Sequence, residues 1–273
     1  MPRSEGKSLA IGLAGLGAIG MSLAQRLAAG LPGLRLVAVA AGDGARAARR
    51  LAAAGIDVPV VATAELARHA EVVVEAAPAA HFRTVAEPVI AAGRILVALS
   101  AGALLNNLDL VERAAQAGGR ILVPTGALLG LDAVRAAAQG EITAVRMVTR
   151  KPPAGLEGAP YLVEHGIVLT RLTVPLKVFE GTAREGARGF PANVNVAAAL
   201  ALAGIGPDRT RLEIWADPGV TRNTHSIEVE ADSARLRMTI ENVPSENPRT
   251  GRITALSVIA CLTGLVAPLR IGS

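Results

Sequence analysis

Residues 9–20 read LAIGLAGLGAIG, and this stretch decides how the first half of the chain folds. The aliphatic run at residues 9–14 has the composition of a buried strand, and glycines follow it at positions 15, 17 and 20. Residues 21–29 continue with apolar side chains at helical spacing, and a second aliphatic run occupies residues 34–41. A strand, a glycine-rich turn, a helix and a second strand within about thirty residues predict a β-α-β unit.

The glycine spacing G-x-G-x-x-G gives this unit a chemical role. The first glycine permits the tight turn, the second lets the backbone approach a pyrophosphate, and the third allows the helix to pack closely on the strand. The helix N-terminus then faces the phosphates. We therefore predict that a dinucleotide is bound by Gly15, Gly17, Ala18, Ile19 and Gly20.

The identity of the dinucleotide stays open between NAD and NADP. Asp43 lies about twenty residues beyond the glycine motif, where an acidic side chain binds the ribose 2′-hydroxyl. Arg46, Arg49 and Arg50 follow it closely and suit a 2′-phosphate instead.

Strand and helix continue to alternate up to residue 123. Further strands are predicted at residues 57–61, 71–76, 94–99 and 120–123, with helical segments between them. Repeated strand-then-helix order predicts a doubly wound parallel sheet, with a Rossmann dinucleotide-binding domain at the N-terminus.

After Pro124 the strands cluster, which indicates a second fold type. They are predicted at residues 141–149, 174–180, 211–216, 224–230 and 234–240, with helices at 131–139 and 193–203. Residues 247–265 turn helical again after Pro244. We therefore predict an α/β protein whose Rossmann domain comprises residues 1–123 plus 245–273. Residues 124–244 form a second, smaller α/β domain with a mixed sheet.

The composition argues against several classes of protein. The net charge is +5, but the cations are almost all arginines scattered among acids, which disfavours a nucleic-acid partner. No apolar stretch is long enough to span a membrane, and the polar N-terminus does not resemble a signal peptide. Cys261 is the single cysteine, and no His or Cys spacing suggests a metal site. We expect a cytoplasmic protein without a metal.

His225 is the histidine whose surroundings best suit acid–base chemistry. It ends the segment DPGVTRNTH at residues 217–225, in which Asp, Arg, Asn and Thr precede it. Proton transfer on an anionic substrate needs a proton acceptor beside groups that fix the anion.

Six stretches together resemble the L-aspartate dehydrogenase family, over nearly the whole chain. They are GLAGLGAIG at 12–20, VPTGALLGLDA at 123–133, KPP at 151–153, FPANVNVAAALALAGIG at 190–206, DPGVTRNTH at 217–225 and ENPRTGRITALS at 246–257. The resemblance implies an NAD(P)-dependent enzyme that oxidises L-aspartate to iminoaspartate. This product hydrolyses to oxaloacetate and ammonia or feeds NAD synthesis. We also expect a homodimer or a larger homo-oligomer.

The resemblance also implies roles for individual residues. His225 is the expected active-site residue, Ala127 a cofactor contact, and either Asn193 or Asn195 a second cofactor contact. The two substrate carboxylates call for cations, and the candidates in the second domain are Arg150, Lys151, Lys177 and Arg222.

Two alternatives stay open from the sequence. One is another two-domain Rossmann reductase, similar to homoserine dehydrogenase or dihydrodipicolinate reductase. The other is a non-catalytic module that senses NAD(P).

Overall fold

The computed structural model describes residues 8–244 and 251–272 of the chain. They form two compact units, each with its own five-stranded sheet. Unit 1 takes its described residues from Met1–Ser100, Asn106–Pro124 and Ala255–Arg270. Unit 2 takes them from Ala101–Leu105, Thr125–Thr254 and Ile271–Ser273.

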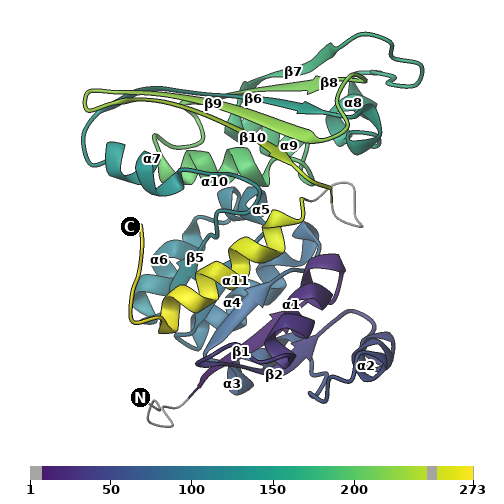
Figure 1. Cartoon of the computed structure of the whole chain (residues 1–273), viewed down its shortest axis with the longest axis vertical. Helices are drawn as coiled ribbons and strands as arrows, with labels where there is room; N and C mark the ends of the chain where they lie inside the picture. Colours follow the sequence, from purple (N-terminus) through teal and green to yellow (C-terminus); the bar gives the residue numbers. More distant parts are fainter. Residues whose placement is uncertain (1–7, 245–250, 273) are drawn as a thin grey trace. The chain divides into compact units, whose positions relative to one another are not determined.

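Unit 1 is built on a parallel sheet with the strand order β2-β1-β3-β4-β5 (Figure 1). Its strands are β1 (Leu9–Ala14), β2 (Leu34–Ala40), β3 (Val72–Glu75), β4 (Ile95–Ala98) and β5 (Arg120–Leu122). Its helices are α1 (Ala18–Ala28), α2 (Gly44–Ala53), α3 (Leu66–His69), α4 (Phe82–Ala91), α6 (Asp109–Gln116) and α11 (Ile253–Val266), with 3-10 turns η1 (Thr63–Glu65) and η2 (Ala79–His81). The strand order reverses between β1 and β3, and ligands of such sheets bind beyond the carboxyl ends of those strands.

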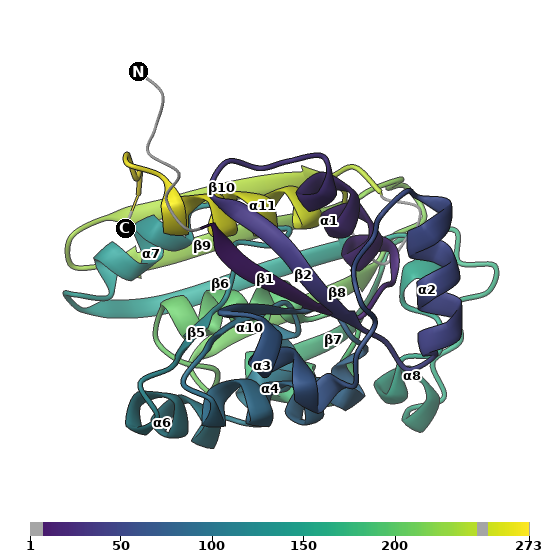
Figure 2. The ribbon, with the colours of Figure 1, turned by 90° about the horizontal axis from the view of Figure 1, so that it is seen from below.

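Helices cover both faces of this sheet, which explains why its strands are aliphatic throughout. Helices α1 and α11 lie on one face, and α3, α4 and α6 lie on the other (Figure 2). Val258 and Leu262 of α11 pack with Ile11 and Leu13 of β1 in one buried apolar cluster. The predicted Rossmann sheet is confirmed.

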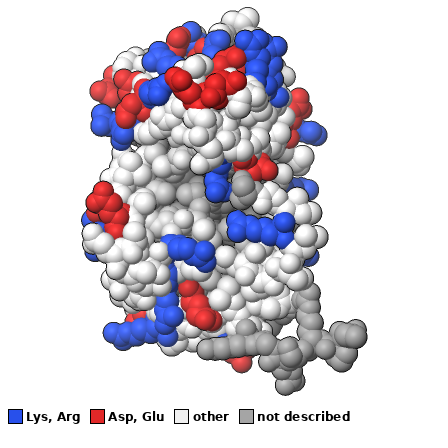
Figure 3. Space-filling model, turned by 90° about the vertical axis from the view of Figure 1, so that its left-hand side faces the viewer, with Lys and Arg blue, Asp and Glu red and all other residues white. Residues whose placement is uncertain are grey.

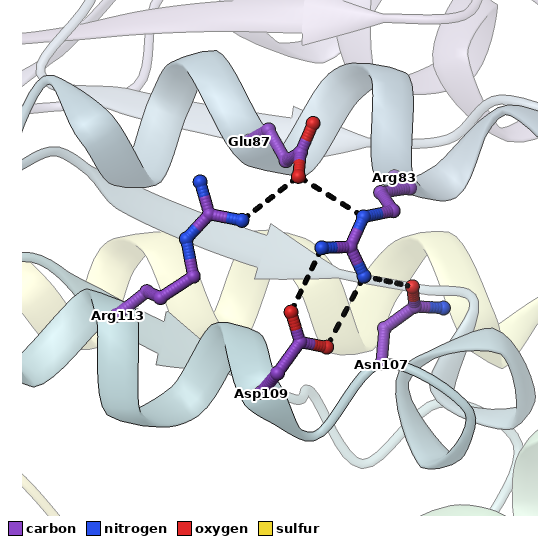
Figure 4. Close-up of polar contacts among 5 residues, drawn as sticks. All are labelled: Arg83, Glu87, Asn107, Asp109 and Arg113. Carbon is purple, nitrogen blue, oxygen red and sulfur yellow. Dashed lines mark hydrogen bonds and ion pairs between the residues drawn. The ribbon is translucent and has the colours of Figure 1, made fainter.

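Helices α4 and α6 are also linked by a polar network on the surface of unit 1 (Figure 4). The Arg83 guanidinium donates to Glu87 at 3.0 Å, to Asn107 at 3.0 Å and to Asp109 at 2.8 Å. Arg113 of α6 donates to the same Glu87 carboxylate at 2.8 Å. Each of these charged side chains is at least 40% exposed, so the network adds little to stability.

Unit 2 contains a mixed sheet with the strand order β10-β9-β6-β8-β7, which confirms the predicted second fold type. Its strands are β6 (Ile142–Lys151), β7 (Leu176–Thr182), β8 (Thr210–Ala216), β9 (Asn223–Ala231) and β10 (Arg235–Asn242). Only the β6–β8 pair is parallel among the described strands of this sheet. The helices are α5 (Ala101–Leu105), α7 (Leu131–Ala137), α8 (Pro160–Glu164), α9 (Ala183–Gly189) and α10 (Asn195–Ala203), with a 3-10 turn η3 (Pro153–Gly155).

The two faces of the unit 2 sheet differ because its strands alternate apolar and polar side chains. The inner face carries buried residues such as Met147 and Val229 and packs against α9 and α10. The outer face carries charges that pair across strands, as in Arg146–Glu213 and Arg237–Glu228. Figure 3 shows acidic and basic side chains intermingled at the top of the view, where this sheet lies.

Two predicted elements differ from the structure. Residues 57–61 form no strand, and only an isolated bridge joins Val60 to Val39. Pro59 explains this, because it lacks the N–H group that a ladder needs. The predicted helix at 247–265 is observed as α11 from Ile253, and its residues 247–250 lie outside the described residues. No helix among the described residues is both long and apolar enough to cross a membrane.

Candidate functional site

The glycine turn of unit 1 lies between β1 and α1, and two of its three glycines are required by the chain itself. Gly15 has φ +103°, and a Cβ there would lie 2.5 Å from the Ala76 carbonyl oxygen. A Cβ on Gly20 would lie 2.1 Å from the carbonyl oxygen of Gly15. The backbone therefore passes too close to itself at both positions for any other residue.

Gly17 differs, because a Cβ there would meet nothing within 4 Å. The protein needs no glycine at this point for its own packing, so the open space suits a group from outside the chain. The first intrahelical bond of α1 runs from Met21 N to Gly17 O, which leaves the N–H groups of Ala18, Ile19 and Gly20 at the free helix end. The turn therefore has the space, the donors and the helix dipole that a dinucleotide pyrophosphate requires.

Asp43 is the N-cap residue of α2 and lies three residues beyond the end of β2. Its Oδ1 accepts a hydrogen bond of 2.8 Å from the Arg46 backbone N–H and so caps the helix. Farther along α2, the Arg50 guanidinium donates to the Leu16 carbonyl inside the glycine turn. The Arg50 guanidinium in contact with the turn suits a 2′-phosphate, whereas the Asp43 carboxylate at the start of α2 suits a ribose hydroxyl.

Glu75 was not singled out from the sequence as a functional candidate. It is the last residue of β3, it is fully buried, and it pairs in register with Ala14 of β1. Ser100 donates to its carboxylate twice, through N and Oγ, each at 2.9 Å. Burial raises the pKa of Glu75 to about 7, although the hydrogen bonds from Ser100 oppose this shift. An acid within the aliphatic run VVVEAA was the signal in the sequence.

In unit 2, His225 lies on the inner face of β9 and is 2% exposed. It stands opposite Thr149 of β6, and its Nδ1 lies 3.1 Å from Thr149 Oγ1. Burial, and then the positive charge of Lys151, lower the pKa of His225 to about 3. The imidazole is therefore neutral near pH 7, so it can form hydrogen bonds but cannot serve there as a cation.

Lys151 lies at the end of β6, two residues beyond Thr149 and on the same inner face. It is 4% exposed, and its Nζ donates to Asn193 Oδ1 at 3.0 Å. Burial lowers the pKa of this amine to about 8. The predicted strand ended at residue 149, so the sequence did not show that Lys151 and His225 share a face.

The other three candidate cations have different surroundings. Arg150 pairs with Asp217 at 3.0 Å and stacks on the Trp215 ring. Lys177 is paired with Glu180 near the surface, and Arg222 is exposed. Lys151 is the one of the four that is buried beside His225.

The two candidate asparagines have distinct partners. Asn193 is held in a turn after the buried Phe190 and accepts the hydrogen bond from Lys151. Asn195 begins α10, and its Oδ1 accepts from the Gly102 N–H at 3.0 Å. Asn193 is thus joined to the Lys151–His225 cluster, whereas Asn195 secures α5.

Ala127 lies between β5 and α7, and its carbonyl oxygen accepts a 3.0 Å hydrogen bond from Asn242 Nδ2. This bond ties the Thr125–Gly126–Ala127 turn to β10, so that the turn has a fixed backbone. Within the described part of the chain, no group of three His, Cys, Asp or Glu residues is placed to hold a metal ion.

Comparison with known proteins agrees with this arrangement. Residues 15–124 match the family described as homoserine dehydrogenase, NAD binding domain, and residues 132–265 match the family described as aspartate dehydrogenase, C-terminal. A parallel sheet, a glycine turn with open space and this match define an NAD(P)-binding oxidoreductase of the Rossmann class.

The second domain and the full-length relatives define the family. The chain is 57% identical to L-aspartate dehydrogenase 3 of Bordetella bronchiseptica, over 99% of this chain and 100% of that protein. It is 54% identical to an L-aspartate dehydrogenase of Bradyrhizobium diazoefficiens, over 99% and 96% of the two chains. The chain belongs to the L-aspartate dehydrogenase family.

A crystal structure of aspartate dehydrogenase from Thermotoga maritima has the same fold, with a TM-score of 0.73 and 21% identity. The similarity covers 97% of this chain and 99% of that one. The homoserine dehydrogenase resemblance considered from the sequence reappears in the match of residues 15–124, and that match concerns the NAD-binding part alone.

Proposed function

We propose that the chain oxidises L-aspartate with NAD⁺ or NADP⁺ to iminoaspartate, which water converts to oxaloacetate and ammonia. The observation that carries the proposal is the buried pair of His225 and Lys151 on one sheet face, in the part of the chain that matches the aspartate dehydrogenase family. Burial keeps the imidazole uncharged and lowers the pKa of the amine. Two such buried polar groups are better explained by binding of a polar, anionic amino acid than by packing in an apolar core.

We assign the two predicted domains separate tasks. The domain of residues 1–123 and 245–273 binds the dinucleotide through Gly15, Gly17, Ala18, Ile19 and Gly20, with Asp43 directed to the ribose. The domain of residues 124–244 binds the amino acid. Ala127, together with either Asn193 or Asn195, contributes to cofactor binding. The bound nicotinamide supplies the acceptor for a hydride from the substrate Cα.

His225 is the proposed active-site residue. Its neutral ring hydrogen-bonds the substrate and later orders the water that attacks the imine carbon. Thr149 fixes the ring from the Nδ1 side at 3.1 Å, so the remaining nitrogen, Nε2, is the one available to substrate and water.

The function is tested by following absorbance at 340 nm with each dinucleotide and a panel of amino acids. We expect an increase with L-aspartate that exceeds the increase with D-aspartate, L-glutamate and L-homoserine. An increase with L-homoserine and none with L-aspartate would overturn the proposal in favour of a two-domain reductase similar to homoserine dehydrogenase.

The remaining expectations stay predictions. A cytoplasmic location is in keeping with the single cysteine, Cys261, which is not part of any disulfide. A homodimer or larger homo-oligomer is checked by light scattering on the purified protein.

A further inference from the structure

Lysine is rare in this chain, and one lysine is deeply buried. Of the 28 basic residues only Lys7, Lys151 and Lys177 are lysines, and the other cations are arginines. Lys151 is 4% exposed, which is unusual because a buried ammonium loses its hydration. A buried cation is normally offset by a carboxylate.

No such carboxylate is present in the described residues, where Nζ of Lys151 forms no ion pair and its hydrogen bond goes to the neutral Asn193 amide. Beside the end of β6 that carries Lys151, the titratable side chains of the paired strands are His225 of β9 and Asp217 directly after β8, whereas the other charged residues of β8 and β9 pair with earlier residues of β6. The Asp217 carboxylate is taken by the Arg150 guanidinium at 3.0 Å and by the Gly219 N–H at 2.9 Å. On the strand that carries Lys151, the charged neighbour is the same Arg150.

These surroundings favour the uncharged amine. Burial lowers the pKa of Lys151 to about 8, and among the described residues no charged group opposes this shift. His225, by contrast, has a pKa of about 3 and therefore holds a proton too weakly to act as an effective base near pH 7. Of the two buried groups, the Lys151 amine is the one whose pKa suits a base that takes up a proton near pH 7.

The residue type points the same way. A guanidinium binds carboxylate better than an ammonium does, because it offers two parallel N–H donors, but it cannot lose its proton in a protein. In a chain that otherwise relies on arginine, a position that only had to bind a carboxylate has no need for lysine. A position that must lose a proton requires it.

We propose that Lys151 is a catalytic residue whose uncharged amine removes a proton from the α-ammonium group of the amino-acid substrate. The proposal rests on the proposed function and names the base for it. The proton passes from the substrate nitrogen to Nζ, which becomes an ammonium. The freed lone pair then forms the C=N bond while the Cα hydrogen leaves with its bonding pair as hydride for the nicotinamide. The product is an iminium ion, and Asn193 Oδ1 steadies the new ammonium at 3.0 Å.

The first test measures the lysines directly and needs no turnover. In protein labelled with ¹³C-lysine, the three Cε resonances are assigned with Lys151→Met and Lys177→Met and followed against pH. We expect a midpoint near 8 for Lys151, whereas the pKa of Lys177 is raised above 10.5 by Glu180. A Lys151 midpoint above that of Lys177 would overturn the proposal.

The second test separates a base from a cation that only binds carboxylate. We expect kcat of the wild type to rise with pH toward a plateau. Lys151→Arg and Lys151→Met should both lower kcat, by about 10²- to 10⁴-fold. A cation that only bound carboxylate would give the opposite pH dependence, and Lys151→Arg would keep most of the activity. Arg235→Met, which removes an exposed ion pair with Glu230 in the same sheet, is the control and keeps wild-type kcat.

Failure of this inference is distinguishable from failure of the function. If the wild type oxidises L-aspartate and Lys151→Arg keeps its kcat, the function stands and the base assignment is wrong. If the wild type has no such activity, the function is wrong and the assignment of a substrate proton to Lys151 falls with it. Dinucleotide affinity and Tm are measured for each variant, and we expect both to stay close to wild type in Lys151→Arg.

Discussion

Gly17 allows the dinucleotide assignment to be tested by a single side chain. Its backbone has φ −71° and ψ −159°, which valine also adopts, and a Cβ there meets nothing within 4 Å. We therefore expect Gly17→Val to fold, with a stability loss of no more than about 1 kcal/mol from the poorer helix N-cap.

Dinucleotide binding, in contrast, should be severely weakened in Gly17→Val. The branched side chain occupies the space through which a pyrophosphate reaches the N–H groups of residues 18–20. Losing two hydrogen bonds to a charged phosphate, at roughly 1.5–3 kcal/mol each, amounts to about 3–6 kcal/mol. This corresponds to a rise in Kd of roughly 10²- to 10⁴-fold.

The assay is a calorimetric titration with NAD⁺ and NADP⁺, combined with Tm measured without ligand. Gly20→Ala is the control, because its Cβ would lie 2.1 Å from the Gly15 carbonyl oxygen, so this variant should lose Tm whether or not ligand is present. Wild-type affinity in a folded Gly17→Val protein would refute the assignment of this turn to the pyrophosphate.

Three further predictions concern other sites. His225→Asn should lower kcat with L-aspartate by roughly 10²- to 10⁴-fold while Tm and dinucleotide affinity stay near wild type; a stable variant that keeps most of its rate would contradict the active-site role. In the folded protein Glu75 has a pKa of about 7, whereas its ordinary value is 4.5, so the folded state binds the proton more tightly than the unfolded state does. The contribution of Glu75 to the free energy of unfolding therefore falls by about 3 kcal/mol as pH rises from 4.5 to 7. Urea unfolding of Glu75→Gln, which mimics the protonated acid, should lack this decline relative to wild type, and parallel curves for the two proteins would show that the carboxyl is not buried as described. Arg83→Ala removes only exposed ion pairs, so Tm should fall slightly at low salt and not at high salt; a large, salt-independent fall would mean that the α4–α6 link is structural.

The sequence predicted the sheet of unit 1 well because its signals are local. An aliphatic run before G-x-G-x-x-G and an aliphatic run about twenty residues later are sufficient to place β1, α1 and β2. The one strand predicted wrongly in this region, at residues 57–61, contains Pro59, whose missing N–H argued against it from the start.

The cluster in unit 2 was only partly predictable, because it depends on strand register. The DPGVTRNTH segment indicated His225, but its partner Thr149 is brought opposite to it by the antiparallel pairing of β6 and β9. Because the predicted strand ended at residue 149, the sequence did not show that Lys151 lies on the same face as His225, although the alternation Val145, Met147, Thr149 continues to Lys151 at the same spacing of two. The pKa shifts of His225 and Lys151 follow from burial, which the sequence does not give.

The position of α11 in the core of unit 1 has a consequence for biosynthesis. Val258 and Leu262 pack against β1 residues that are translated near the start of the chain. The aliphatic face that they cover therefore stays exposed on the nascent chain while most of unit 2 is made. The last helix of unit 1 is made after most of unit 2, so translation that stops before residue 253 yields a chain with an uncovered apolar surface prone to aggregation and degradation.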